Sequence, residues 1–360
     1  MAGFVAQAGD RQLVIDEIQR LPALTLAVKA AIDRDRRPSR FILTGSSSLL
    51  RVRGTADSLA GRVGRLTLYG LSQGELLHRP DDFTTIVTAD PARLTHLETQ
   101  LQRSDYAELL AIGAYPDVRN ATERSRSIWF DSYLRGVIGR DLPELRREAR
   151  PARSLAILRT LAGRQSAELV KAKLAQETAV PASTITGYLD LLHDVGLIAS
   201  IPPWTPKIAD REIARPKSFV IDSGVAMWLA RLAPAQLGQL EYRDAFAGLL
   251  ESFVAAELLR QRTWSTRDFS IFHYRNRNKN NEEVDLVLEL NDGSIIAVEV
   301  KSSTSFSASH FKGLVSLRDQ LGPRFVAGIV LNTGTSGYRY SDRLYGAPVS
   351  ALWELSPSGA

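Results

Sequence analysis

The stretch EVDLVLELNDGSIIAVEVKSS, residues 283–303, predicts a β-hairpin on which the C-terminal part of the chain is built. Two runs of alternating, mostly β-branched or leucine residues flank Asp292-Gly293, a dipeptide typical of hairpin turns. A three-residue loop centred on Asp292 pairs the runs so that Asp285 lies directly opposite Glu299. The sequence therefore places two acids side by side on neighbouring strands.

The two faces of this hairpin favour that register over its neighbours. Lys301 comes next along the face that carries Asp285 and Glu299, and the opposite face is wholly apolar. A slip of one residue would push charge into the apolar face, so we expect the first register. The predicted apolar face consists of Val284, Leu286, Leu288, Ile296, Val298 and Val300.

Two adjacent carboxylates need a cation. Cross-strand neighbours lie about 5 Å apart, where two ionised carboxylates repel by roughly 3 kcal/mol at an effective dielectric constant of about 20. Lys301 is the obvious cation in the sequence, and Mg²⁺ would serve as well, because hard cations prefer carboxylate oxygens. The alternative is a hairpin with a polar, solvent-facing stripe and an Asp–Lys pair.

An Asp followed, about a dozen residues later, by Glu-x-Lys resembles the PD-(D/E)xK nuclease fold, a restriction-endonuclease-like α/β domain. The resemblance implies that Asp285 and Glu299 hold Mg²⁺ and that Lys301 activates water or stabilises the attacked phosphate. Glu251, in a helix expected over 247–260, matches the acid of that superfamily's first helix. The implied catalytic set is therefore Glu251, Asp285, Glu299 and Lys301.

Length and composition set the broad class. The chain of 360 residues should hold two or three domains, and 44% hydrophobic and 24% charged residues are ordinary for a globular protein. The longest apolar runs fall short of the ~20 residues that span a bilayer, and no signal peptide opens the chain. With no cysteines as well, we expect a cytoplasmic protein without a membrane partner. The net charge of +5 is compatible with a nucleic-acid partner.

The N-terminal segment predicts a small parallel sheet. An apolar strand over 13–15 ends in Asp16-Glu17, a helical pattern follows over 24–32, and a second strand spans 41–44. Strand, helix and strand in that order indicate parallel strands whose polar ends share one edge. An ATPase uses such an edge, with an Asp for Mg²⁺ and a Glu for the attacking water.

The segments LVIDEIQRLP (13–22), FILTGSSSLL (41–50) and SLAGRVGRLTLYGLSQGEL (58–76) resemble a family of bacterial and archaeal AAA-type ATP-binding proteins. They correspond to the family's Walker B, sensor and following core segments, and the family's C-terminal half is a conserved domain of unknown function. The likeness covers nearly the whole chain. It continues through residues 113–116, 129–142, 202–204, 219–224 and 283–303.

This resemblance implies an ATP site with an Mg²⁺ ligand, a water-polarising acid, a γ-phosphate sensor and an arginine finger. Another interpretation is that the Asp-Glu pair only caps the next helix. In the order of the four roles, the implied residues are Asp16, Glu17, Thr44 or Ser46, and Arg62 or Arg65.

One feature of the AAA family is missing from this sequence. The family carries GxxxxGK[ST] upstream of the Walker B strand, and none of the 360 residues forms that motif. Without it, neither the amide cradle for the phosphates nor the P-loop lysine is present. We therefore expect an N-terminally truncated AAA-type domain that does not hydrolyse ATP independently.

Residues 154–203 predict a winged helix. Helical patterns cover 154–161, 167–176 and 183–192, and a strand begins at 196. The third helix starts with small polar residues that suit entry into a major groove, but it lacks the Arg, Lys, Asn or Gln that read base edges. DNA contact and a protein-packing role both remain open.

We expect an α/β chain with four parts, divided at 1–80, 81–150, 151–203 and 204–360. They are a partial P-loop AAA-type parallel sheet, a helical lid-like segment, a winged helix and a restriction-endonuclease-like domain, in that order. The favoured function is that of an AAA-family ATP-binding protein with a DNA-associated or regulatory role.

Two other functions remain open. One is an Mg²⁺-dependent DNA nuclease, for which a basic stretch over 257–279 would supply a rim; such a charge run also suits a solvated face. The other is a non-catalytic module that binds a partner protein. The sequence does not predict an oligomeric state.

Overall fold

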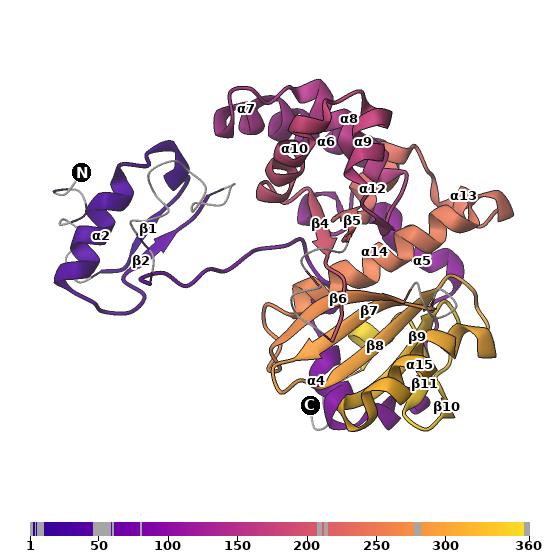
Figure 1. Ribbon diagram of the computed structural model, residues 1–360. Coiled ribbons are helices and arrows are strands. Elements are labelled where there is room, and N and C mark those ends of the chain that lie inside the picture. Colours follow the sequence, from indigo (N-terminus) through magenta and orange to yellow (C-terminus); the bar gives the residue numbers. More distant parts are fainter. Residues whose placement is uncertain are drawn as a thin grey trace.

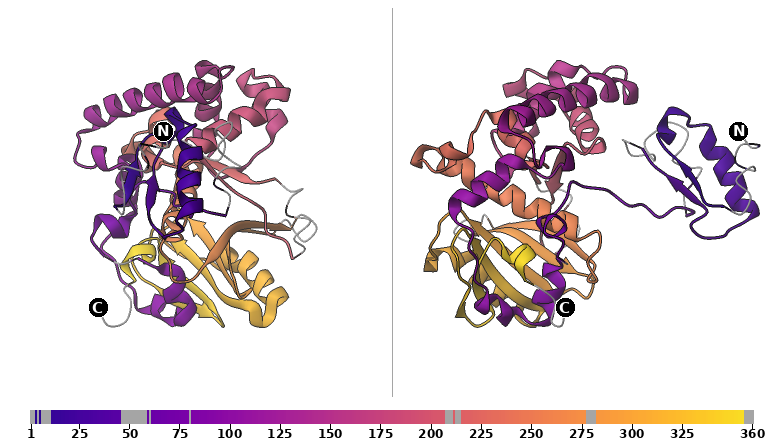
Figure 2. Two further views of the ribbon diagram at one scale, coloured as in Figure 1. Left: turned by 90° about the vertical axis from the view of Figure 1, so that its left-hand side faces the viewer. Right: turned by 180° about the vertical axis from the view of Figure 1, so that it is seen from behind.

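The computed structural model describes residues 11–45, 61–79, 81–206, 215–276 and 282–355, together with the single residues 3, 5, 59 and 211. Figure 1 shows a small N-terminal unit that stands apart from a larger body, and the right-hand view of Figure 2 shows the same separation from behind. Residues 63–69 join the two without forming a helix or strand. No described helix has both the length and the apolar composition that a bilayer crossing requires.

The N-terminal unit is a two-stranded parallel sheet with one helix. Strand β1 (Leu13–Ile15) pairs with β2 (Phe41–Leu43), and α2 (Leu24–Arg34) connects them. Val28 of α2 is fully buried in a core cluster of this unit, which is separate from the cores of the larger body. The predicted parallel sheet is confirmed for these two strands.

The larger body begins with a helical segment of six short helices and two longer ones. Ser72 caps the first of them, since its Oγ accepts the N–H of Glu75 at 3.0 Å and its own N–H bonds the Glu75 carboxylate at 2.8 Å. These six helices and two longer ones run as α3 (Gln73–Leu76), α4 (Phe83–Ala89), η3 (Pro91–His96), α5 (Arg103–Ile112), η4 (Pro116–Val118), α6 (Glu123–Gly136), η5 (Val137–Asp141) and α7 (Leu142–Leu145).

Part of the predicted lid-like segment packs against the C-terminal sheet instead of forming a separate lid. Phe83, Val87 and Leu94 are fully buried in the main core. The chain after η3 then continues along the sheet edge, where Glu98 bridges to Ser336 in antiparallel fashion. The apolar side chains of this segment are therefore buried by strands more than 200 residues away in the sequence.

Residues 151–206 and 215–220 form a compact arrangement that we call the helix–sheet unit. Its three-stranded antiparallel sheet has the order β3-β5-β4. The three predicted helices and the strand after them are observed in that order, but a short strand, β3, occupies residues 167–168, where the second helix was expected to begin. Strand β5 lies within 204–360, the part expected to form the last domain, but it pairs in this sheet. The elements are α8 (Pro151–Ala162), β3 (Ala167–Glu168), α9 (Lys171–Thr178), α10 (Ala182–Asp194), β4 (Ile198–Ile201) and β5 (Lys217–Val220).

The last part of the chain is a mixed six-stranded sheet with the order β10-β11-β9-β8-β7-β6. Strands β6, β7 and β8 are antiparallel, while β9 is parallel to both β8 and β11. From α14 (Arg243–Gln261) onward the main elements follow the order helix, three strands, helix and strand, and β10, β11 and α16 (Ala351–Glu354) extend it. The strands are β6 (Phe269–Asn276), β7 (Glu282–Leu290), β8 (Ile295–Lys301), β9 (Phe325–Asn332), β10 (Tyr338–Ser341) and β11 (Leu344–Pro348).

Helices cover both faces of this sheet. The long helix α14 lies between the helix–sheet unit and one face, and α15 packs on the other (Figure 1). Small helices complete the chain before α14 and around α15. The helices are α12 (Ser223–Ala230), α13 (Pro234–Leu237), η6 (Leu240–Tyr242), α14 (Arg243–Gln261), η7 (Ala308–Phe311), α15 (Lys312–Leu321), η8 (Gly322–Arg324) and α16 (Ala351–Glu354).

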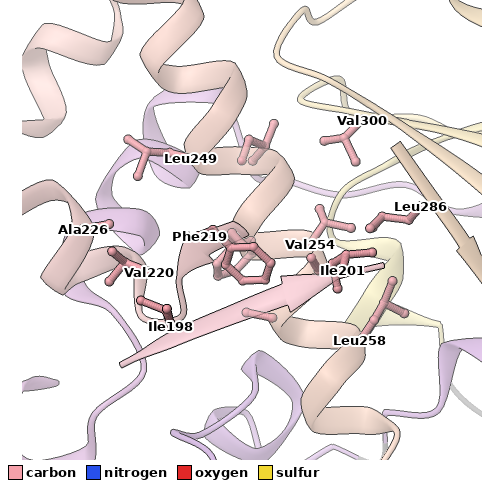
Figure 3. Close-up of a cluster of buried hydrophobic side chains, with 14 of the residues drawn as sticks. Ile198, Ile201, Phe219, Val220, Ala226, Leu249, Val254, Leu258, Leu286 and Val300 are labelled. Carbon is pink, nitrogen blue, oxygen red and sulfur yellow. The ribbon is translucent and has the colours of Figure 1, made fainter. Parts of the chain in front are cut away.

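Helix α14 joins the helix–sheet unit to the six-stranded sheet through one hydrophobic core. Leu249 and Val254 of α14 lie among side chains of β4, β5 and α12, and the same cluster reaches Leu286 and Val300 of the sheet (Figure 3). Because these residues share one core, groups from β5, α14 and the hairpin are held at fixed positions relative to one another.

Candidate functional site

The hairpin β7–β8 has the register that its sequence predicts. Leu286 pairs with Val298 and Leu288 with Ile296. One ladder step further, the backbone N–H of Asp285 donates to Oε2 of Glu299 at 3.3 Å. The two acids are therefore neighbours across the strands.

A β-bulge between β6 and β7 changes the face of the sheet toward which side chains of β7 point near Asp285. Phe272 of β6 pairs with Val287 and Tyr274 pairs with Val284, so one residue of β6 faces two residues of β7, Asp285 and Leu286. A bulge of this kind interrupts the alternation of side chains and re-aims them. The structure thus corrects the predicted apolar face, because Val284 packs in the core on the α15 side and its five partners pack on the α14 side.

The other predicted face is not a solvent-facing stripe. Val287, Ile295 and Ala297 are fully buried in the core under α15. Asp285 is only 7% exposed and Glu299 only 9%. The acids therefore lie inside the protein, where a carboxylate needs a partner.

Lys217, the first residue of β5, supplies that partner from the helix–sheet unit. Its Nζ lies 2.8 Å from Oε1 of Glu251 and 2.9 Å from Oε1 of Glu283. Oδ1 of Asp285 is 3.1 Å from the same nitrogen. The Lys217 side chain is 5% exposed, so these ion pairs are formed almost without water.

The remaining oxygens of the hairpin acids are also paired. Oδ2 of Asp285 accepts the N–H of Val300 at 2.9 Å, and Oε1 of Glu299 lies 2.5 Å from Nζ of Lys301. The structure therefore brings together the four residues predicted for the nuclease-like site. It adds Lys217 and Glu283, which the sequence did not point to. We call the four carboxyl groups the acid cluster: Glu251, Glu283, Asp285 and Glu299.

The acid cluster perturbs the ionisation of its members. Burial raises the pKa of Glu251 well above its usual range, and the nearby charge of Asp285 adds to the shift. Burial likewise raises the pKa of Glu299 to about 8, again with a contribution from Asp285. Burial alone would lower the pKa of Lys217, but the charges of the surrounding carboxylates, Asp285 first, raise it instead. The four carboxyl groups of the acid cluster outnumber the two ammonium groups that contact them, those of Lys217 and Lys301, by two.

The acid cluster as arranged does not fit the Mg²⁺ ion that the nuclease-like resemblance implies. Within the described ranges, no three His, Asp or Glu side chains are placed to hold a metal ion together. The ammonium of Lys217 stands between the carboxylates of Glu251 and Asp285, where an ion would have to bind. Both oxygens of Asp285 are already engaged, by Lys217 and by the backbone.

Sequence reasoning missed Lys217 because its partners lie far along the chain. The signal in the sequence is weak: Lys217 opens the run KSFV, whose other residues suit a buried strand. A lysine in a buried strand calls for a buried carboxylate. Only the three-dimensional structure shows which carboxylates meet it.

Two of the basic residues in the stretch 257–279, expected to form a rim near the site, are engaged in ion pairs. Arg260 is buried, and its Nη1 lies 2.6 Å from Oε1 of the fully buried Glu257. Arg275 pairs with Glu168 at 3.1 Å. Both guanidinium groups therefore pair with carboxylates of the same chain. Residues 277–281 lie outside the described part.

Two residues predicted for the ATP site lie together in the N-terminal unit. Asp16 and Thr44 follow the parallel strands β1 and β2, and Oγ1 of Thr44 donates to Oδ1 of Asp16. Glu17 adopts a left-handed backbone at the start of a 3₁₀ turn (η1, Ile18–Arg20), and its side chain does not cap that turn. Ser46 lies outside the described residues.

The two candidate arginine fingers lie elsewhere on this unit. Nε of Arg62 is 2.7 Å from Oδ1 of Asp33, near the end of α2. Arg65 is exposed on the linker. Their assignment to a nucleotide therefore stays a prediction.

Three families match successive parts of the chain. Residues 2–77 match a family described as an AAA domain. Residues 103–236 and 246–352 match two families, each described as a domain of unknown function, DUF8612 and DUF4143. The DUF8612 match ends before α14 and the DUF4143 match begins inside it. The DUF8612 match therefore contains β5 with Lys217, and the DUF4143 match contains the acid cluster.

Two curated relatives extend over most of the chain. The uncharacterized proteins Rv2008c of Mycobacterium tuberculosis and Mb2031c of Mycobacterium bovis are each 27% identical over 315 residues, which is 85% of this chain. The chain spans 62% of the length of these relatives.

Among solved structures, protein VC1899 from Vibrio cholerae is 12% identical and aligns over 93% of this chain and 79% of its own, with a TM-score of 0.24. That score is too low to inform the fold. The chain is thus homologous to the mycobacterial proteins and consists of an AAA-domain segment followed by the domains DUF8612 and DUF4143.

Proposed function

We propose that this protein is an AAA-type, DNA-associated regulatory protein whose nuclease-like site does not cut DNA in the conformation described. The observation that supports it most is the position of Lys217, whose ammonium touches three carboxylates of the acid cluster. A metal-dependent nuclease needs those oxygens for its metal ion. A buried ammonium in that place leaves the site without the group that would activate water.

The AAA segment supports the regulatory part of the proposal. Asp16 and Thr44 lie at adjacent strand ends, as an Mg²⁺–nucleotide would require. The sequence, however, has no glycine-rich loop or P-loop lysine to hold the phosphates. We therefore propose that the 360 residues do not hydrolyse ATP independently, and that the AAA segment serves nucleotide binding only together with groups that supply such a cradle.

The helix–sheet unit supports the association with DNA. The first turns of α10 expose Ser183, Thr184 and Thr186, and a helix with small polar residues at its start can enter a major groove. The guanidinium of Arg146, the residue that ends α7, lies directly against Gly187 of α10. Because glycine has no side chain, this position lets a cation lie on the face that would meet the phosphates.

The connection between β4 and β5 does not share this role. Arg211 bonds the carboxylate of Glu289 through both terminal nitrogens, at 2.6 and 3.1 Å. Trp204 is buried and donates to the same carboxylate at 3.3 Å. Trp204 and Arg211 of this connection, the wing of a winged helix, are thus bound to the six-stranded sheet, and the proposed DNA contact is made by α10.

The proposal can be tested by measuring binding of the 360-residue chain to duplex DNA across a series of salt concentrations. We expect the logarithm of the affinity to fall linearly with that of the salt concentration. Arg146→Ala should weaken binding and reduce the slope by about one phosphate contact. Arg339→Ala, on exposed β10, is the matched control and should change neither.

Two results would contradict the proposal. Absence of binding at protein concentrations up to about 100 µM, where non-specific binding is normally seen, would remove the DNA association. Cleavage of plasmid or linear DNA by the wild-type chain with Mg²⁺ or Mn²⁺ would show that the site is active as it stands.

A further inference from the structure

The linker between the N-terminal unit and the larger body has the side-chain pattern of a β-strand. Residues 63–69 read VGRLTLY, and none of them belongs to a helix or strand. Leu66 is 87% exposed and Leu68 is 97% exposed. Within the described ranges, Leu66, Thr67 and Leu68 form no hydrogen bond. We propose that residues 65–69 are an interface strand, which pairs in antiparallel fashion with the same residues of a second copy of this chain.

Exposed apolar side chains are concentrated in this part of the chain. Among the described residues, twelve large hydrophobic side chains are exposed, and eight of them lie between residues 14 and 77, which is less than a fifth of the sequence. Val14 and Ile42 pair at the centres of β1 and β2, and their side chains are also exposed, so one apolar face of the N-terminal sheet is uncovered. A single exposed leucine is ordinary, but such a concentration marks a surface that contacts protein.

The sequence of the interface strand is complementary to itself. An antiparallel pair centred on Thr67 places Leu66 opposite Leu68 of the second copy, and Leu68 opposite its Leu66. Opposed residues of antiparallel strands point to the same face, so the four leucines form one apolar face. The neighbouring symmetric registers, centred on Leu66 or on Leu68, each set a leucine against a glycine, Gly64 or Gly70. The side chains therefore select the register centred on Thr67.

Charge complementarity also favours a second copy as the occupant. In the register centred on Thr67, Arg65 lies opposite Tyr69 of the second copy, and the symmetry repeats this pair. A guanidinium is attracted by an aromatic ring, and the register sets no like charges directly opposite each other. A two-fold contact of this kind closes on itself, so the expected assembly is a dimer and not a fibre.

Contacts at both ends of the linker hold the interface strand in place. At one end, Nε of Arg62 lies 2.7 Å from Oδ1 of Asp33. At the other end, the N–H of Leu71 donates to the carbonyl of Ala114 at 2.9 Å, and Gly70 lies so close to Ala114 that a side chain would collide. Between these contacts the linker crosses from the N-terminal unit to the larger body (Figure 1). Fixed ends reduce the freedom that the strand loses when it pairs.

The size of the contact predicts a weak dimer. A stable interface buries about 800 Å² on each partner, from about 20–30 residues. The five residues of the interface strand supply only part of that area, and the uncovered face with Val14 and Ile42 is an apolar surface that can extend it. We therefore expect association in the micromolar range. This dimer goes beyond the proposed DNA-associated function and does not depend on it.

The first experiment uses disulfide formation, because the wild-type chain contains no cysteine. In Thr67→Cys the introduced residues of the two copies would be directly opposed, with Cα atoms about 4.5–5.5 Å apart, a distance that a disulfide spans. In Leu66→Cys they would be diagonal neighbours about 7–8 Å apart, which is too far.

The rate of disulfide formation is measured with a mild oxidant and non-reducing gel electrophoresis, without DNA or nucleotide. We expect Thr67→Cys to form the linked dimer at least about tenfold faster than Leu66→Cys. Leu240→Cys, an exposed position of η6 on the larger body, is the second control and should be as slow as Leu66→Cys. Equal rates in the three variants would overturn the proposal.

Sedimentation velocity of the wild-type chain from about 1 to 100 µM is the second measurement. We expect a dimer that dissociates on dilution. Leu66→Lys/Leu68→Lys sets four cations on one face of the paired strands, and it should stay monomeric over that range because like charges directly opposite each other repel. Ile128→Lys/Leu240→Lys, at two exposed apolar positions of the larger body, is the matched control and should behave as wild type.

The variants of the interface strand should fold as wild type does, because positions 66–68 lie outside every helix and strand and their side chains are exposed. A wild-type chain that remains monomeric at about 100 µM, or a dimer that persists in Leu66→Lys/Leu68→Lys, would overturn the proposal. Neither result depends on whether the chain binds or cuts DNA, so this proposal and the proposed function fail separately.

Discussion

The N-terminal unit and the acid cluster each place an aspartate beside a neighbouring strand, but the surroundings of the two carboxylates are opposite in kind. Asp16 is exposed, and its partner Thr44 is a neutral hydroxyl of the adjacent strand. Asp285 is buried, and its two oxygens are bound by Lys217 and by the backbone of Val300. One edge is open to solvent, and the other is filled from within the chain.

This difference separates residues that stabilise the fold from residues that can be replaced at little cost. Exposed carboxylates remain hydrated, and their interactions contribute at most about 1 kcal/mol. A buried ion pair adds little net stability, but loss of one partner leaves an uncompensated charge and is strongly destabilising. The acid cluster should therefore respond to substitution far more than the open edge does.

The largest effect is expected for Asp285→Ala. The substitution leaves Lys217 with fewer carboxylates and the N–H of Val300 without an acceptor. We expect the free energy of unfolding to fall by about 3–5 kcal/mol, measured by urea denaturation. Asp16→Ala, at the open edge, is the matched control and should change it by less than about 0.5 kcal/mol. Equal effects at the two sites would contradict the comparison.

The hairpin could be predicted from the sequence, and the cation in its acid cluster could not. The register follows from alternation over a few residues and a two-residue turn signal, which are local properties. The bulge at Asp285 depends on where β6 pairs, and sequence alternation carries no sign of it. Lys217 reaches Asp285 across 68 positions of the chain, a distance at which a side-chain partner is set by tertiary packing.

The same limit applies to the boundary of the helix–sheet unit. Its helices were predicted because each has a 3.6-residue pattern, whereas β5 was assigned to the last domain. β4 and β5 are separated by a 15-residue connection, too long to be recognised as a hairpin turn. The pairing of Ile198 with Val220 and of Ile201 with Lys217 is therefore visible only in the structure.

A smaller effect is expected where that connection binds the six-stranded sheet. Arg211→Gln removes two charged hydrogen bonds to Glu289 and the contact of the guanidinium with the ring of Phe272, 4.7 Å from its centroid. We expect a loss of about 2 kcal/mol and faster amide hydrogen exchange at Trp204, whose N–H bonds the carbonyl of His273. Arg339→Gln serves as the exposed control, and slow exchange at Trp204 in Arg211→Gln would show that the connection is held by other contacts.

The pH dependence of stability gives a still smaller effect, next to the closed site. Burial lowers the pKa of His273 below the ordinary value of about 6.5. Since the unfolded chain then binds the proton more tightly, the stability that His273 contributes is present above pH 6.5 and is lost as the pH falls through 6.5 toward its lowered pKa.

We expect His273→Gln to reduce the loss of stability between pH 7 and pH 5 by about 1 kcal/mol, measured by urea denaturation at each pH. His96→Gln, in an exposed position of η3, should leave the slope unchanged. A slope identical in wild type and His273→Gln would mean that the imidazole gains its proton without cost in the folded state.

The smallest effect is expected from removing residues 1–69, which deletes the open edge altogether. The core cluster of the N-terminal unit shares no residue with the two clusters of the larger body. The contacts that begin the larger body, such as Leu71 N–H to the carbonyl of Ala114, are kept. Calorimetry should therefore show the main unfolding transition within about 2 °C of that of the full chain, since a change of 1 kcal/mol shifts a domain of this size by about 2–4 °C. A larger downward shift would mean that the exposed strand edge of the N-terminal unit stabilises the closed site after all, and the two regions would have to be treated as one.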